Sequence, residues 1–284
     1  MALSTKLIKT RLRSIGNTKK ITRAMEMVSA AKMRRAVSTT LATRSYAQTT
    51  AELVTALSQY IHEESHPLLQ AGKGEQTLAI LITANRGLAG SFNTNVIAEA
   101  QKVVGDQARW VTIGRKGVES LARAQADLVA DFHKADIINS VESVLPIVKL
   151  ITTEYLTGKY KRVLVIYTDY ISALTQKPHV EQLLPVIVAP DEAIQANETQ
   201  IAFEPDSDTV LETILPRYLE IRLYQALLES NASEHSARMV TMKNATESAG
   251  DMIDELTLAF NQARQAAITR EIAEIAGGKA ALAA

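Results

Sequence analysis

The sequence contains no cysteine among its 284 residues. This absence excludes disulfide bridges, thiolate zinc sites, iron–sulfur clusters and thiol nucleophiles. Aromatic residues make up only 5% of the chain, although aromatic side chains bury the largest areas in globular cores. No run of about twenty uncharged apolar residues occurs, and the first fifteen residues lack the apolar stretch of a signal peptide. We therefore expect no membrane-spanning helix, and expect much of the chain to lie outside a compact core.

The formal net charge is zero, but the charges are unevenly distributed. Residues 1–44 carry eleven Lys or Arg residues and one acidic residue, whereas residues 185–284 carry seven basic and sixteen acidic residues. The chain between them is nearly balanced. A basic beginning and an acidic end of one chain indicate that the two ends pair with each other or with charged partners.

The first sixty residues have the composition of one long helix. Between Leu3 and Tyr60 there is no proline and a single glycine, Gly16. Apolar residues follow steps of four and three in two runs, and this spacing predicts a narrow coiled-coil seam that requires a partner helix. The runs are Ile8, Leu12, Ile15 and Ile21, Met25, Val28. Gly16 lies between them and marks the expected irregularity of the helix.

The middle of the chain alternates short apolar runs with helical stretches. Strands are predicted at 77–83 and 163–167, and weaker strands at 110–113, 128–132 and 183–188. Helices are predicted between them at 93–104, 116–124 and 141–156. This alternation is typical of a small α/β domain with a mostly parallel sheet.

The last quarter returns to a helical pattern. A second seam is predicted at Met242, Ala245, Ala249, Met252, Leu256, Phe260, Ala263 and Ala267. Two long helices with seams and opposite charges satisfy each other as an antiparallel coiled coil. We predict an N-terminal coiled-coil helix at 1–61, an inserted Rossmann-like α/β domain at 75–190 and a C-terminal coiled-coil helix at 208–284.

No catalytic constellation emerges from the sequence. The glycine turn at 87–90 follows a strand but matches neither the dinucleotide fingerprint nor a P-loop, so a structural turn is favoured over a nucleotide site. The five histidines lack metal-ligand spacing, and no nucleophile elbow occurs. We predict a non-catalytic protein without cofactor or metal.

Several stretches, in order along the chain, resemble the gamma subunit family of F-type rotary ATP synthases. Arg13–Arg35 (RSIGNTKKITRAMEMVSAAKMRR) is similar to its N-terminal signature and Asn85–Asn93 to its glycine loop, with Ala89 in place of the usual cysteine. Phe203-Glu204-Pro205 resembles its Tyr-Glu-Pro motif. Ser233–Met239 and Ala263–Glu271 resemble its C-terminal signatures.

The resemblance implies a central-stalk rotor that couples proton-driven ring rotation to ATP synthesis in catalytic beta subunits. The implied partners are the alpha and beta subunits, the epsilon subunit and the membrane c-ring, with indirect association to the cytoplasmic side of a bacterial membrane. By motif position, the resemblance assigns beta contacts to Met25, Arg264, Gln265 and Thr269, and ring or epsilon contacts to Phe203 and Glu204. The resemblance also implies that a basic face of the N-terminal helix contacts an acidic segment of beta. This face comprises Lys19, Lys20, Arg23, Lys32, Arg34 and Arg35.

Two other functions remain open from the residues alone. The basic first 44 residues also suit a coiled-coil adaptor that binds nucleic acid by counterion release, although no base-reading motif accompanies them. A small α/β enzyme that acts through the 87–90 turn is a weaker possibility.

Overall fold

The computed structural model describes residues 5–58, 66–104, 108–138, 140–187 and 207–283. By their contacts they form two compact units, residues 29–238 and residues 1–28 with 239–284. Helix α1 (Thr5–Ser58) and helix α5 (Ser207–Ala283) each contribute to both units. No helix among the described residues is long and apolar enough to cross a membrane.

The larger unit contains a five-stranded sheet in the order β3-β2-β1-β4-β5. Its strands are β1 (Gln76–Ile82), β2 (Ala108–Ile113), β3 (Asp127–Phe132), β4 (Tyr160–Tyr170) and β5 (Gln176–Leu184). All neighbouring strands are parallel except β4 and β5, which form an antiparallel pair. The predicted α/β class and mostly parallel sheet are therefore confirmed.

Four of the five strands lie where the apolar runs predicted them, but β5 begins earlier than predicted. Its first seven residues, Gln176–Gln182, are polar apart from Val180 and Pro178. An edge strand buries only one face and tolerates proline, so it lacks the continuous apolar run of a central strand. Residues 185–187 of the predicted strand are not in β5, and residue 188 lies outside the described part.

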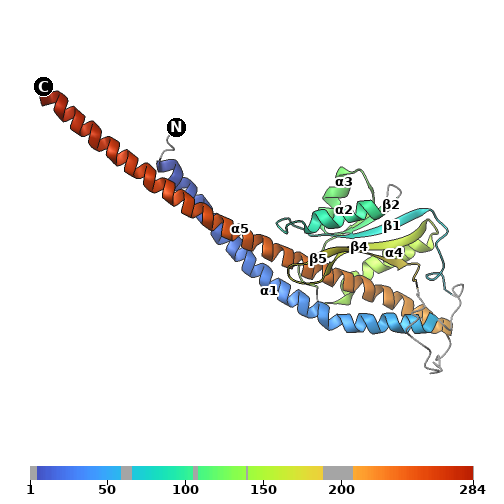
Figure 1. Cartoon of the computed structure of the whole chain (residues 1–284). Helices are drawn as coiled ribbons and strands as arrows, with labels where there is room; N and C mark the ends of the chain where they lie inside the picture. Colours follow the sequence, from blue (N-terminus) through green and yellow to red (C-terminus); the bar gives the residue numbers. More distant parts are fainter. Residues whose placement is uncertain (1–4, 59–65, 105–107, 139, 188–206, 284) are drawn as a thin grey trace. The chain divides into compact units, whose positions relative to one another are not determined.

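Helices cover both faces of the sheet (Figure 1). On one face α2 (Phe92–Val104) and α3 (Arg115–Arg123) pack on β1, β2 and β4 through a core that includes Trp110 and Val96. On the other face, α5 and α4 (Leu145–Leu156), which follows the short helix η2 (Val141–Val144), share the main core with α1.

Within this larger unit, residues 223–236 of α5 are buried on every side. A helix buried all round must have packing partners on all of its faces. Leu223 and Leu227 of α5 belong to the core shared with the sheet, and Thr43 of α1 donates a hydrogen bond of 3.0 Å to Gln225. This part of α5 therefore lies between α1 and the sheet.

The smaller unit is a two-helix coiled coil of the first part of α1 and the last part of α5. The two helices run antiparallel, because the hydroxyl oxygens of Thr22 and Thr246 lie 2.8 Å apart while Lys19, earlier in α1, reaches Gly250, later in α5. Two long helices with a central mixed sheet match the predicted architecture.

The seam of this coiled coil differs from the predicted one. On α1 it runs through Ile8, Leu12, Ile15 and Thr22, whereas Ile21 and Val28 are exposed. The steps of four and three continue unbroken from Ile8, so the register places a threonine, and not the next aliphatic residue, against α5.

A similar shift of one position occurs on α5. Thr246 is buried and Ile253 half-buried, whereas Met252 is exposed and Ala245 is half-buried beside the seam. Helix α1 continues through Gly16, where the sequence predicted an irregularity, and α5 continues through Gly250 and residues 277–278. At Gly16 and Gly250, packing of the two helices compensates for the weak helix propensity of glycine.

Candidate functional site

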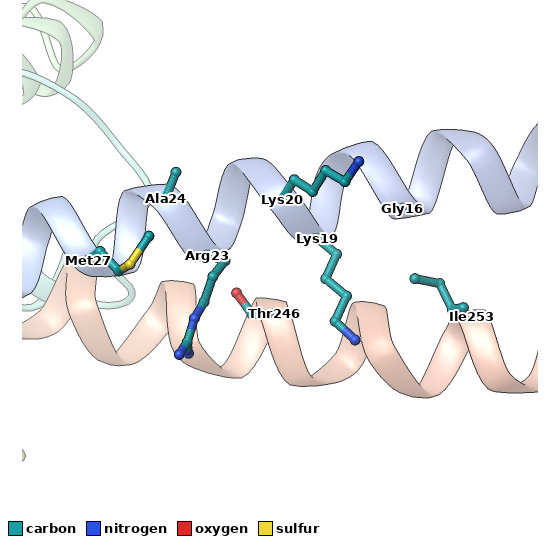
Figure 2. Close-up of a pocket in the computed structure, with 8 residues that line it drawn as sticks. All are labelled: Gly16, Lys19, Lys20, Arg23, Ala24, Met27, Thr246 and Ile253. Atoms are coloured by element: carbon teal, nitrogen blue, oxygen red, sulfur yellow. The ribbon is translucent and has the colours of Figure 1, made fainter.

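A groove with basic walls lies between α1 and α5 in the coiled-coil unit. Its volume is about 640 Å³. The lining residues are Gly16, Lys19, Lys20, Arg23, Ala24, Met27, Thr246 and Ile253. In Figure 2, Lys19 and Arg23 extend from α1 toward α5, and Thr246 and Ile253 point back toward α1. We call this surface the basic groove.

Small residues create the groove. Gly16 has no atom within 4 Å of the place where a Cβ would stand, so its absent side chain leaves open space. At Gly250 a Cβ would lie 3.0 Å from the Nζ atom of Lys19 and 3.7 Å from its Cε atom. Lys19 occupies a seam position in the heptad of α1, and the bare backbone of Gly250 lets its stem lie across α5.

The positive charges of the groove are not neutralised by α5. No carboxylate pairs with Lys19 or Lys20 in the described part of the chain, and Arg23 pairs with Glu26 of its own helix at 3.1 Å. Among the described residues, the expected pairing of a basic α1 with an acidic α5 is found in the larger unit, where Arg44 donates to Glu229 at 3.1 Å. The groove is therefore lined mainly by apolar atoms, including the stems of its basic side chains, and bordered by positive charges that α5 does not pair.

Apolar side chains accompany these charges. Ile21, Met27 and Val28 are 61%, 58% and 55% exposed, and Ala24 between them is exposed as well. Ile21, Ala24 and Val28 recur at the three- and four-residue spacing of one helix face. An apolar stripe beside unpaired lysines is typical of a surface that a partner covers.

The other predicted contacts on α1 have different surroundings. Met25 is half-buried in the coiled coil. Lys32 belongs to the larger unit and donates to Asp136 at 2.8 Å, and this interaction lowers the pKa of that carboxyl group. Arg34 and Arg35 are exposed. Of the six residues of the predicted basic face, three line the basic groove, one is a lysine paired with Asp136 and two are exposed arginines.

The predicted contacts near the end of the chain all lie on α5. Arg264, Gln265 and Thr269 are exposed there, and so are Ile268, Ile272 and Ile275. Within the coiled-coil unit this end of α5 extends past the start of α1 (Figure 1). Phe203 and Glu204, and most of the connecting segment at 190–208, lie outside the described residues.

A second feature is found at the carboxyl ends of the parallel strands. In doubly wound sheets this edge forms the crevice that binds nucleotides. Here α5 occupies it, because Ser233 donates to the carbonyl oxygen of Thr168 near the end of β4, and Arg238 donates to those of Arg86 and Gly87 after β1. The turn itself is tight, with positive φ at Leu88 and Gly90. The glycine turn therefore serves to receive a helix.

Sequence patterns did not reveal the polar contacts that hold this edge together. Lys134, in the loop after β3, is 2% exposed and donates to Glu234 at 2.8 Å. A lysine in a loop is ordinarily solvated. Its only sequence signal was that Glu234 belongs to one of the ordered motifs in α5, which assigned no partner to it.

Comparisons with known proteins identify the family of the chain and agree with its fold. A family model described as ATP synthase matches residues 4–282. The chain is 42% identical to the ATP synthase gamma chain of Symbiobacterium thermophilum, with 99% of each chain covered. A chain in the Tetrahymena thermophila mitochondrial ATP synthase central stalk and c-ring structure has a TM-score of 0.61 and 25% identity, covering 79% of this chain and 99% of that one. A chain of the Euglena gracilis mitochondrial ATP synthase structure that contains OSCP, F1 and the c-ring has a TM-score of 0.73 and 19% identity, covering 98% and 94%.

Proposed function

The chain belongs to the ATP synthase gamma-chain family and is a central-stalk rotor subunit of an F-type ATP synthase, and from this premise we propose that its basic groove is a contact surface for the catalytic ring. The carrying observation is the set of unpaired cations at Lys19 and Lys20, which lies beside an exposed apolar stripe. A rotor must touch its stator without binding any position permanently. Exposed charges serve that need because they guide a partner and exchange it readily.

The occupant that fits the groove is an acidic amphipathic segment of a beta subunit. Carboxylates of such a segment complement Lys19, Lys20 and Arg23, and its apolar side chains cover Ile21, Met27 and Val28. Rotation of the asymmetric shaft then presents this surface to each of three beta subunits in turn. A segment that binds one orientation better shifts the conformational equilibrium of that subunit toward synthesis or release.

We place catalysis in the beta subunits and give this chain a mechanical role. The support is that the crevice in which a doubly wound sheet binds nucleotides is filled by α5. The exposed end of α5, with Arg264, Gln265 and Thr269, suits a second contact with the alpha–beta ring.

The α/β domain provides the remaining contacts in this proposal. Its partners are the epsilon subunit and the membrane c-ring, with Phe203 and Glu204 near the ring. Proton flow through the ring supplies the torque, and the chain associates with the cytoplasmic side of a bacterial membrane only through that ring.

Charge reversal of the groove tests the proposal. The variant Lys19→Glu/Lys20→Glu/Arg23→Glu, assembled with alpha and beta subunits, should lower the rate of ATP hydrolysis by about tenfold, because three attractive contacts become repulsive. A control with equal charge change, Lys102→Glu/Arg123→Glu/Lys159→Glu on exposed positions of the α/β domain, should leave alpha–beta assembly and ATP hydrolysis intact.

Two results would count against the proposal. One is failure of the unaltered chain to purify with alpha and beta subunits. The other is a groove variant whose complex hydrolyses ATP at the unaltered rate. Tight DNA binding with a steep salt dependence, abolished by Arg34→Glu/Arg35→Glu, would instead support the nucleic-acid adaptor.

A further inference from the structure

The polar contacts between the α/β domain and α5 centre on one buried lysine. Lys134 lies in the loop after β3, and its Nζ atom donates to Oε2 of Glu234 at 2.8 Å and to Oγ of Ser230 at 3.4 Å. The same Nζ lies 5.5 Å from the ring centroid of Phe92, the first residue of α2. One cation therefore connects the loop after β3, the start of α2 and two positions of α5.

Glu234 carries the connection onward to the glycine turn. Its second oxygen accepts from Arg238 at 2.7 Å, and Arg238 donates to the carbonyl oxygens of Arg86 and Gly87 at 3.3 and 3.4 Å. Burial opposes the ionised form of Glu234, but the charges of Lys134 and Arg238 outweigh it and lower the pKa of this carboxyl group. Both loops at the carboxyl edge of the sheet are thus bound to one carboxylate of α5.

Other contacts between α5 and this edge of the sheet are polar as well. Asn231 and His235 of α5 meet the backbone carbonyl of Asp136, at 3.4 and 3.3 Å. Ala237 adds an apolar contact here by packing on Ala84, Ala89 and Phe92. Farther back, by contrast, α5 is held by the aliphatic main core that contains Leu215 and Leu219. The sheet edge therefore holds α5 by directional polar contacts.

A buried ion pair is a weak source of stability, because desolvation of both charges offsets their attraction. Its directional contacts instead select one geometry among several that apolar packing would permit. Leucine side chains allow a helix to slide or turn at little cost, but a lysine that must meet Glu234, Ser230 and the Phe92 ring does not.

We propose that Lys134 is a positioning residue for rotary coupling: with Glu234 and Arg238 it locks the α/β domain to α5, so that torque received by the domain turns the shaft without slip. The inference rests on the proposed rotor function. It assigns a part in transmitting torque to a loop lysine that belongs neither to the coiled coil nor to the lining of the basic groove.

The test compares two activities of the whole ATP synthase in membrane vesicles. ATP hydrolysis and ATP-driven proton transport are measured for Lys134→Met, for Lys134→Arg and for Lys116→Met. Lys116 is the matched control, because its ion pair with Glu119 lies within α3, on the opposite face of the sheet. We expect the ratio of transport to hydrolysis to fall at least about twofold in Lys134→Met, to recover in Lys134→Arg and to stay unchanged in Lys116→Met.

The ratio separates positioning from folding. Poor folding removes whole complexes and lowers both activities together, which leaves the ratio unchanged and overturns the proposal. Because Lys134→Met strands a buried carboxylate, the double variant Lys134→Met/Glu234→Gln is measured too, since it removes both charges of the pair and keeps an amide oxygen that accepts from Arg238. A lowered ratio in the double variant supports the lock, and an unaltered ratio overturns it. If the complex that contains the unaltered chain neither hydrolyses ATP nor transports protons, the result contradicts the rotor function itself.

Discussion

The hydroxyl oxygens of Thr22 and Thr246 lie 2.8 Å apart, at buried positions on the facing sides of α1 and α5. Each hydroxyl also contacts the backbone of its own helix, Thr22 at the carbonyl oxygen of Lys19 and Thr246 at that of Met242. A buried polar pair in an apolar seam specifies register, because any shift leaves both hydroxyl groups opposite apolar atoms. This pair therefore fixes how far α1 is advanced along α5 in the coiled-coil unit.

Replacement of the threonines should show this dependence as a double-mutant cycle. Thr22→Val or Thr246→Val alone should lower the free energy of unfolding by about 1–2 kcal/mol, because the remaining hydroxyl loses its cross-helix partner. The double variant should cost less than the two single changes together. Chemical denaturation of the full-length chain provides the measurement. Additive effects would show that the two hydroxyl groups do not interact.

Gly250 and Gly16 provide a comparison between two glycines of the coiled-coil unit, one on each helix. Alanine at either position should raise the free energy of unfolding by about 0.5–1 kcal/mol, because glycine is a poor helix former. Gly16→Ala should achieve the full gain, since open space surrounds it. Gly250→Ala should gain less, because the new Cβ would lie 3.0 Å from the Nζ atom of Lys19, which must move.

Thermal unfolding of the two variants in the unaltered and the Lys19→Ala backgrounds separates these terms. Without the lysine side chain, Gly250→Ala should stabilise the chain as much as Gly16→Ala does. A persistent difference in that background would mean that the Lys19 contact is not the cause.

The strands, the long helices and the parallel sheet were predictable because each depends on local apolar periodicity. The seam of the coiled coil was not fully predictable, since it follows the register set by Ile8 and Leu12 and not the apolarity of each position. Thr22 and Thr246 are in the seam, while Ile21 and Met252 face solvent. Exposed apolar residues on such a helix indicate a surface that a partner protein covers. In the sequence they look the same as apolar residues that pack against the other helix of the coiled coil.

Only those parts of the candidate site that lie close together in the sequence could be predicted. Lys19, Lys20 and Arg23 do line one groove, but Lys32 pairs with Asp136, more than a hundred positions along the chain. The Lys134–Glu234 pair joins residues equally distant in sequence. Such pairs arise from the topology of the sheet and cannot be inferred from spacing along the chain.

A carboxyl pair in the larger unit should make stability depend on pH. A hydrogen bond with Glu229, burial and the charge of Glu229 raise the pKa of Asp169 to about 7. The folded chain therefore holds a proton that the unfolded chain releases near pH 4, so this group's contribution to stability falls as pH rises from about 4 to about 7. Burial disfavours ionised Glu229, but hydrogen bonds with Asp169, Gln225 and Arg44 outweigh it and lower its pKa, so its own effect lies at lower pH.

Asp169→Asn should remove this pH-dependent loss of stability, because the Asn side chain does not ionise. Its amide N–H can still donate to Glu229. Relative to the unaltered chain, the variant should gain on the order of 1 kcal/mol in free energy of unfolding as pH rises from 5 to 8; the gain is this small because partial exposure screens the repulsion. Urea midpoints from pH 5 to 8 provide the measurement. The difference between the two chains cancels the opposite trend of His66 and His235, whose pKa values are lowered by burial. Asp131→Asn, at an exposed position of β3, should show no such pH-dependent gain.

The exposed end of α5 allows contact to be separated from stability. Arg264 is exposed, so Arg264→Ala should change the free energy of unfolding by less than about 0.5 kcal/mol. ATP synthesis by the assembled complex should nevertheless fall about two- to tenfold if the guanidinium group touches the alpha–beta ring. Arg270→Ala makes the same chemical change six residues later, which the helical period places on another face.

The two arginine variants therefore differ only in the face that loses a charge. Synthesis lowered by Arg264→Ala and not by Arg270→Ala would assign the contact to the face of α5 that bears Arg264. Equal losses in both would indicate that the ring senses only the total charge of this helix end, since long-range attraction does not depend on the face. Unaltered synthesis in both would remove Arg264 from the contact and leave the exposed isoleucines, Ile268, Ile272 and Ile275, as the surface that the ring must cover.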